Sequence, residues 1–228
     1  MATTTPGGPM RHDEAVVTVA GAPVRVYRAG SGPTLVLLHG GGLDETQLSW
    51  APVWRALTAH ARLVAPDLPG YGASPLGHTE PTLAGYRGWL LALLDTLGIQ
   101  QAILAGLSLG GGIALRTALD APARVAGLVG LAPCGVSPRP SGGTAGYFAG
   151  QLGGIGCRVL LLSGAHDRLV PPNDVRAATA NVRHARFVLV TGAGHWLPRD
   201  APEQVTDQLL GFLATAPAAP SAPARPDQ

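Results

Sequence analysis

The chain contains no lysine, so all 16 of its basic residues are arginines. These arginines are scattered, and the formal net charge is only +2 at pH 7. Both facts argue against a nucleic-acid surface or a patch for anionic membranes. No apolar run approaches the length of a membrane span, and the first residues lack the apolar core of a secretory signal. We therefore expect a cytoplasmic protein without a nucleic-acid partner or a membrane span.

Cysteine is also scarce, with only Cys134 and Cys157 present. Neither cysteine has the spacing of a metal site or of a redox pair. Two thiols do not make a disulfide framework, and both lie beside apolar runs. We expect them to be buried free thiols.

The length and composition suit one domain with short ends. The 228 residues are 46% hydrophobic, which is enough for a sizeable core. Residues 1–13 are polar, and residues 216–228 are rich in Pro and Ala without apolar periodicity. We expect a flexible N-terminus over 1–13, a single domain over 14–215 and a disordered tail over 216–228.

Between these ends, short apolar runs alternate with longer stretches of helical periodicity. Such alternation predicts an α/β fold, a mostly parallel sheet with helices on both faces. The first two runs flank a Gly-containing turn, which predicts a hairpin and therefore an antiparallel N-terminal edge. The expected strands are 15–20, 24–28, 34–38, 63–66, 102–105, 125–131, 158–162 and 187–190, and the expected helices are 45–60, 81–97, 109–119, 174–182 and 202–213.

Three polar residues follow separate apolar runs. Ser108 follows the fifth run, Asp167 the seventh and His195 the eighth. Open parallel sheets bind ligands at the carboxyl ends of their strands, so these side chains are expected to meet there. The order Ser, Asp, His is that of the nucleophile-elbow hydrolases, in which Gly-x-Ser-x-Gly joins a strand to a helix.

The stretch Ala-Gly-Leu-Ser-Leu-Gly-Gly-Gly at 105–112 fits such an elbow. Side chains two residues before and after Ser108 would collide at a sharp turn, and Gly106 and Gly110 remove them. The helix N-terminus would bring the Leu109 N–H toward a developing oxyanion. We expect the second oxyanion donor to be Gly41, in the glycine-rich loop that follows the third strand.

A serine nucleophile needs a base within hydrogen-bond reach, and the base needs an acid that orients it. We expect His195 to be the base and Asp167 the acid, rather than a surface histidine and a turn aspartate. His39 ends a buried strand and is expected to be a structural hydrogen-bonding residue. Asp67 is expected to brace the loop that follows it.

Several further residues follow the strand ends. Leu43, Tyr71 and Trp196 are expected to line a substrate pocket, although aromatic residues at such places are often core. Asp200 and Asp207 are poorer candidates for the acid because both follow the histidine.

With five motifs in order, the chain resembles the α/β-hydrolase fold superfamily, in its branch of bacterial esterases, lipases and meta-cleavage-product hydrolases. The resemblance spans most of residues 15–214. It implies an eight-stranded sheet, the triad and oxyanion donors named above, no metal and no cofactor. The motifs are HGGG at 39–42, DLPGYGAS at 67–74, GLSLGG at 106–111, GAHDRLVP at 164–171 and GAGHWLP at 192–198.

One segment departs from that family. Residues 134–156, between the sixth and seventh strands, are Gly-rich and too short for the helical lid of the relatives. The lid is either naturally minimal or has been removed. We expect an open cleft, with Tyr147, Phe148 and Leu152 forming a one-turn stub over it. An exposed apolar floor would favour a homodimer.

The leading functional hypothesis is a carboxylesterase-like serine hydrolase that cleaves small esters through an acyl-enzyme. The enzymatic alternatives are hydrolysis of a carbon–carbon bond in a meta-cleavage product and hydrolysis of a thioester. The non-enzymatic alternative is a hydrolase-fold protein that binds a small ligand with little turnover.

Overall fold

The structure is a computed structural model that describes residues 10, 12–138 and 146–215. The expected disordered tail and nearly all of the expected flexible N-terminus lie outside the described residues. The middle of the segment 134–156 lies outside them as well.

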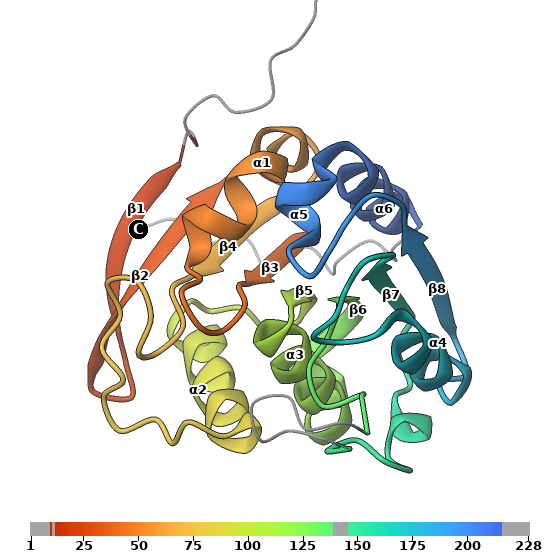
Figure 1. The fold of residues 1–228 in the computed structure, drawn as a ribbon. Coiled ribbons are helices and arrows are strands. Elements are labelled where there is room, and N and C mark those ends of the chain that lie inside the picture. Colours follow the sequence, from red (N-terminus) through yellow and green to blue (C-terminus); the bar gives the residue numbers. More distant parts are fainter. Residues whose placement is uncertain (1–9, 11, 139–145, 216–228) are drawn as a thin grey trace, which may run out of the picture.

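Eight strands form one sheet in the order β1-β2-β4-β3-β5-β6-β7-β8 (Figure 1). The hairpin β1–β2 is antiparallel and β2 also pairs antiparallel with β4, whereas the pairings from β4 through β3 to β8 are parallel. The predicted fold class, with its antiparallel N-terminal edge, is therefore confirmed. The strands are β1 Asp13–Val19, β2 Ala22–Ala29, β3 Thr34–Leu38, β4 Arg62–Pro66, β5 Ala102–Leu107, β6 Val125–Leu131, β7 Val159–Gly164 and β8 Ala185–Val190.

Burial explains why the central strands are almost entirely apolar. Every residue of β5 and β7 is buried, because helices cover both faces of a parallel sheet. Strand β1 lies at the edge, and there buried or half-buried residues alternate with exposed ones. The sequence pattern thus reports the position of a strand in the sheet.

Helices α1, α5 and α6 lie above the sheet in Figure 1, and α2, α3 and α4 lie below it. Helix α2 begins later than the expected Pro81, because the Thr82 hydroxyl caps it by accepting a hydrogen bond from the Gly85 N–H at 3.0 Å. The short helix α5 was not expected from periodicity. The helices are α1 Thr46–Thr58, α2 Leu83–Thr96, α3 Leu109–Asp120, α4 Pro172–Ala180, α5 Leu197–Asp200 and α6 Pro202–Ala214.

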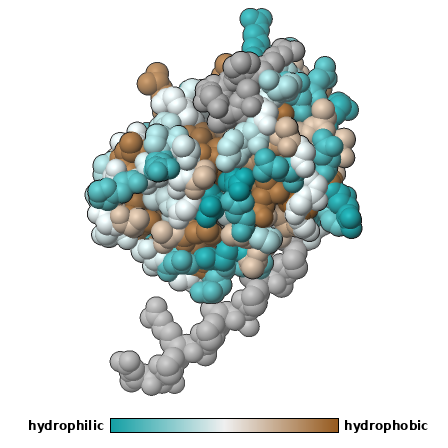
Figure 2. Space-filling view, turned by 90° about the horizontal axis from the view of Figure 1, so that it is seen from below, coloured by the Kyte–Doolittle hydropathy of each residue, from teal (hydrophilic) through white to brown (hydrophobic). Residues whose placement is uncertain are grey.

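On the face seen in Figure 2, hydrophobic patches lie among hydrophilic and neutral side chains. None of the helices in the described ranges is both long and apolar enough to cross a bilayer. Neither cysteine forms a disulfide within the described ranges, and Cys134 is buried as expected whereas Cys157 is half-buried.

Candidate active site

Ser108 occupies the turn between β5 and α3 with φ 50° and ψ −109°. A residue with a side chain rarely adopts positive φ, and holding it there costs about 1–3 kcal/mol. The surroundings hold this conformation: the Ser108 N–H donates to the Leu131 carbonyl at 2.9 Å, and its carbonyl accepts from Gly112 and Cys134 N–H groups at 3.0 and 2.9 Å. Strain of this kind at a strand end makes Ser108 a candidate for a functional position.

Two glycines make this turn sterically possible. A Cβ added to Gly106 would lie 2.2 Å from the carbonyl carbon of Gly110, and one added to Gly110 would lie 2.3 Å from the Leu38 oxygen. Both distances are far inside van der Waals contact. The expected collisions at this elbow are therefore confirmed.

The Asp167 carboxylate and the His195 ring are joined by a hydrogen bond of 2.8 Å between Oδ2 and Nδ1. The other carboxylate oxygen accepts the N–H groups of Leu169 and Val170 at 2.8 and 2.9 Å. Because the carboxylate accepts from Nδ1, the proton of the neutral ring resides there and Nε2 is available as a base.

Backbone contacts explain why these two residues meet. Asp167 lies in the loop after β7 and His195 in the loop after β8, and these strands pair along their whole length. Beyond the sheet, the His166 N–H donates to the Ala193 carbonyl at 2.9 Å. The two loops are thus in register before any side chain contributes.

Ser108 and His195 line one cavity of about 490 Å³. Within the described part of the chain, no hydrogen bond joins the Ser108 hydroxyl to the His195 ring. Such contacts are commonly long in enzymes without substrate and shorten when substrate binds. The other lining residues are Gly41, Gly42, Tyr71, Pro81, Thr82, Leu83, Tyr86, Leu109, Cys134, Leu169 and Val170.

A phenol stays protonated in this largely apolar cavity. Burial, together with the neighbouring Tyr71, raises the pKa of Tyr86 to about 12. The Tyr86 hydroxyl donates to the Pro69 carbonyl at 3.1 Å. Among the described residues, no group of three or more His, Cys, Asp or Glu side chains is placed to hold a metal ion.

Both expected oxyanion donors border the cavity. Leu109 is the first residue of α3, so its N–H has no acceptor within the helix. A Cβ added to Gly41 would lie 3.6 Å from Leu109 Cδ2, which shows that the two backbone segments are neighbours. The Gly41 and Leu109 N–H groups therefore belong to neighbouring backbone segments that border one cavity.

His39 fixes the orientation of the Gly41 N–H group. Its Nε2 accepts the Leu68 N–H at 2.9 Å, so the ring proton resides on Nδ1, which donates to the Gly40 carbonyl at 2.7 Å. The carbonyl and the following N–H of a trans peptide point in opposite directions. Holding the Gly40 carbonyl therefore sets the direction of the Gly41 N–H. Burial lowers the pKa of His39 and keeps this ring neutral.

The structure brings only one of the three expected pocket residues to the cavity. Tyr71 lines it, and its ring meets His39 edge-to-face at 5.3 Å between centroids. Leu43 is instead 94% exposed, because the glycine loop carries it into solvent. Trp196 is directed elsewhere, since its indole N–H donates to the Ser49 hydroxyl on α1 at 3.2 Å.

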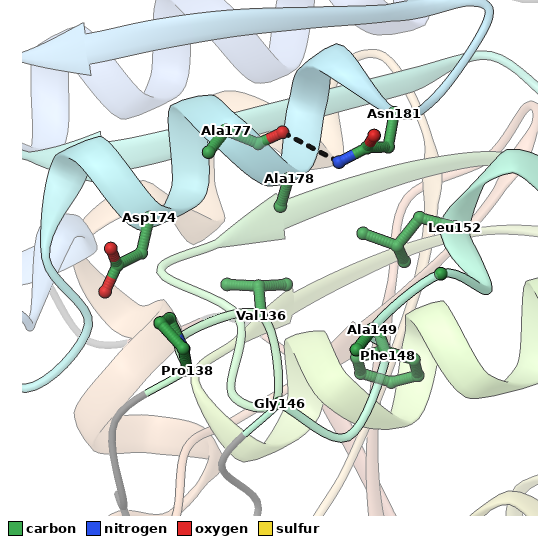
Figure 3. Close-up of a pocket in the computed structure, with 11 residues that line it drawn as sticks. Val136, Pro138, Gly146, Phe148, Ala149, Leu152, Asp174, Ala177, Ala178 and Asn181 are labelled. Carbon is green, nitrogen blue, oxygen red and sulfur yellow. Dashed lines mark hydrogen bonds between the residues drawn. The ribbon is translucent and has the colours of Figure 1, made fainter.

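The expected stub over the cleft is also corrected. Phe148 and Leu152 are buried and line a separate cavity of about 240 Å³ together with residues of α4, such as Ala178 (Figure 3). Neither they nor Tyr147 belong to the described lining of the Ser108 cavity. Phe148 and Leu152 belong to the buried core, and Tyr147 packs against it.

Two aspartates hold the site loops, a role that the sequence did not indicate. Asp200 Oδ2 accepts the Gly194 N–H at 2.8 Å, directly before His195. Asp44 Oδ2 accepts the Gly40 N–H at 2.6 Å, directly before Gly41. In a sequence, an aspartate close to the start of a helix is interpreted as a capping residue. The positions of Asp44 and Asp200 therefore did not predict either of these contacts.

Comparison with known proteins identifies relatives by sequence and by structure. The model of the alpha/beta hydrolase fold family matches residues 33–153. A 2-hydroxymuconate semialdehyde hydrolase of Pseudomonas sp. (strain CF600) is 37% identical over 127 residues, which are 53% of this chain and 44% of that protein. A pimeloyl-[acyl-carrier protein] methyl ester esterase of Aeromonas hydrophila is 37% identical over 140 residues, 57% of this chain and 53% of that protein.

The chain thus spans about half of the length of these curated relatives. Among solved structures, a carboxylesterase of Bacillus subtilis superposes with a TM-score of 0.77 at 24% identity. The superposition covers 90% of this chain and 92% of that one. It shows that the two proteins share a fold.

Proposed function

The chain belongs to the alpha/beta hydrolase fold family, and from this premise we propose that it is a serine hydrolase that cleaves small carboxylic esters. One observation carries the proposal. Ser108, which adopts a positive φ, lines the same cavity as His195. The Nδ1 atom of His195 is hydrogen-bonded to the buried carboxylate of Asp167. This is the constellation that turns a hydroxyl into a nucleophile.

In the proposed reaction, Ser108 Oγ attacks the ester carbonyl carbon while His195 Nε2 takes its proton. The N–H groups of Gly41 and Leu109 stabilise the negative charge on the former carbonyl oxygen. The intermediate collapses, the carbon–oxygen bond to the alcohol breaks, and His195 returns the proton to the leaving alkoxide. Water, deprotonated by His195, then releases the carboxylic acid from the acyl-enzyme and restores Ser108.

The lining of the cavity favours an uncharged acyl group. Leu83, Leu109 and Val170 contribute apolar surface, and burial of a charged group against such surface is costly. Ester cleavage also agrees with the activity for which the Aeromonas relative is named. A short acyl chain would be contained within about 490 Å³.

A second candidate is cleavage of a carbon–carbon bond, favoured by the similarity to the Pseudomonas hydrolase. Thioester hydrolysis would use the same residues. These reactions share the nucleophile, so substrate comparison separates them: the ester proposal expects p-nitrophenyl esters to be turned over faster than a meta-cleavage product or an acyl thioester.

The proposal is tested with p-nitrophenyl acetate and butyrate, and with covalent labelling by a fluorophosphonate. We expect Ser108→Ala to abolish turnover and labelling. Ser163→Ala is a matched control, since that buried hydroxyl on β7 has no hydrogen-bond partner among the described residues. Labelling without turnover would mean that Ser108 is reactive but that the substrate belongs to a class other than these esters. Absence of both in a folded protein would refute it and favour a ligand-binding role.

A further inference from the structure

We propose that Asp44 is a positioning residue that ties the oxyanion loop to the histidine loop through Ser49 and Trp196. The proposal rests on the proposed function, because it concerns how the donors and the base are held relative to each other. The four residues Gly40, Asp44, Ser49 and Trp196 form a continuous chain of hydrogen bonds. This chain joins the loop that follows β3 to the loop that follows β8.

The first observation is a buried carboxylate that serves neither as an ion-pair partner nor as a cap. Asp44 is only 6% exposed, and none of the ion pairs found among the described residues includes it. The residue at the cap position of α1 is Glu45, whose side chain makes no capping bond. Burying a carboxylate is costly unless several donors surround it.

Asp44 has those donors, and one of them comes from the oxyanion loop. Its Oδ2 accepts the Gly40 N–H and the Ser49 hydroxyl, each at 2.6 Å, and its Oδ1 accepts the Glu45 N–H at 2.8 Å. Gly40 lies against the nucleophile, since a Cβ added there would be 3.5 Å from the Ser108 Cβ. The carboxylate therefore holds the peptide group directly before the one that presents the Gly41 N–H.

Ser49 continues the chain of hydrogen bonds toward the base. Its hydroxyl is fully buried, donates to Asp44 and accepts the Trp196 indole N–H at 3.2 Å. Trp196 follows His195 directly in the chain. The donors all point the same way, from indole to hydroxyl to carboxylate, and such aligned bonds strengthen one another.

The sheet cannot supply this link, because three strands lie between β3 and β8. The oxyanion loop follows β3 and the histidine loop follows β8. The hydrogen bonds from Trp196 to Ser49 and from Ser49 to Asp44 connect these two loops directly. Together these three residues set the distance and orientation between the oxyanion donor and the base.

The test compares Asp44→Asn, Ser49→Ala and Trp196→Phe with matched controls. Trp50→Phe and Ser163→Ala also remove a buried indole N–H or hydroxyl, but these groups have no hydrogen-bond partner among the described residues. We expect Asp44→Asn to lower kcat by roughly 100-fold, in the range for loss of one oxyanion donor. Ser49→Ala and Trp196→Phe should each lower kcat by about 3- to 10-fold with KM changed less than about twofold. The controls should stay within about twofold of wild type.

The double variant Ser49→Ala/Trp196→Phe should lose no more kcat than the worse single variant, because both remove the same link. Multiplicative losses, or single variants that match the controls, would overturn the proposal. Because loss of folded protein would lower the apparent kcat and leave KM unchanged, kcat is calculated per folded molecule, with the folded fraction of each variant and control measured by circular dichroism.

An activity-independent readout separates failure of this proposal from failure of the proposed function. The chain has four tryptophans, so the Trp196 indole N–H is assignable by NMR through Trp196→Phe. We expect Asp44→Asn to shift this resonance, although Ser49 lies between the two residues. An unchanged resonance would refute the link even if the enzyme hydrolyses esters, whereas a shifted resonance in a protein without turnover would leave the link standing and refute only the esterase function.

Discussion

Two substitutions of His39 distinguish its two hydrogen bonds. The amide nitrogen of Asn can take the place of Nδ1 and keep the bond to the Gly40 carbonyl, but it is too short to accept the Leu68 N–H. Gln reaches the place of Nε2 and keeps the Leu68 bond, but it leaves the Gly40 carbonyl without its donor. The two variants therefore remove one observed bond each, of 2.9 and 2.7 Å respectively.

The expected magnitudes follow from burial. His39 is fully buried, and a buried backbone group left without a partner costs about 1–3 kcal/mol. Both variants should therefore lose a similar amount of unfolding free energy. Activity should differ: His39→Gln releases the peptide that aims the Gly41 N–H and should lower kcat by about 100-fold or more, whereas His39→Asn should lower it by less than about tenfold.

The assay combines urea denaturation with hydrolysis of p-nitrophenyl butyrate. His60→Asn is a suitable control, since that histidine is exposed at the end of α1. The reasoning would be refuted if the two variants had equal kcat at equal loss of stability. It would also be refuted if His39→Asn were the less active of the two, because the Leu68 bond would then be the one that matters.

Three further outcomes are expected. Asp167→Asn should lower kcat by roughly 10³- to 10⁴-fold, because an amide favours the wrong tautomer of His195; steady-state kinetics that stay within tenfold of wild type would contradict this. Gly106→Ala should destabilise the fold by at least about 1–3 kcal/mol, since its methyl group would collide with Gly110; an unchanged denaturation midpoint would exclude the collision. Burial lowers the pKa of His39 below its ordinary 6.5. The stability that comes from the neutral His39 ring is therefore complete above about pH 6.5 and is lost as pH falls through the pKa of the folded protein. Denaturation midpoints measured from about pH 7.5 to 5 should fall less steeply in His39→Asn than in the wild type, and parallel slopes would contradict His39 as the cause of the pH dependence.

The elements of the fold could be predicted because local signals and burial agree. Continuous apolar runs such as Thr34–Leu38 became central strands, and Pro202 opens the last helix as its fixed φ allows. Boundaries were less predictable. Helix α2 begins at its Thr82 cap rather than at the proline before it, because a hydroxyl that caps an N–H group outweighs a residue that merely tolerates the position.

The residues that line the pocket were predicted less well than the meeting of Ser108, Asp167 and His195 at one edge of the sheet. Ser108, Asp167 and His195 each follow a strand, and a parallel sheet carries all such positions to one edge. Leu43 and Trp196 follow strands of the same sheet, but whether a loop side chain faces a cavity depends on the neighbours that it meets. Solvent surrounds Leu43, and a serine of another helix binds Trp196.

Local properties of the sequence specify the sheet, the turn at Ser108 and the edge of the sheet at which chemistry can occur. These properties are the order of the motifs, the glycines around Ser108 and the apolar periodicity. The contacts that orient the backbone and side chains of the site are not local in the sequence. His39 meets Leu68, 29 positions away, and Ser49 meets Trp196, 147 positions away. Such long-range pairs exist only after packing has brought separate elements together, because hydrogen-bond geometry depends on positions in space and not on spacing along the chain.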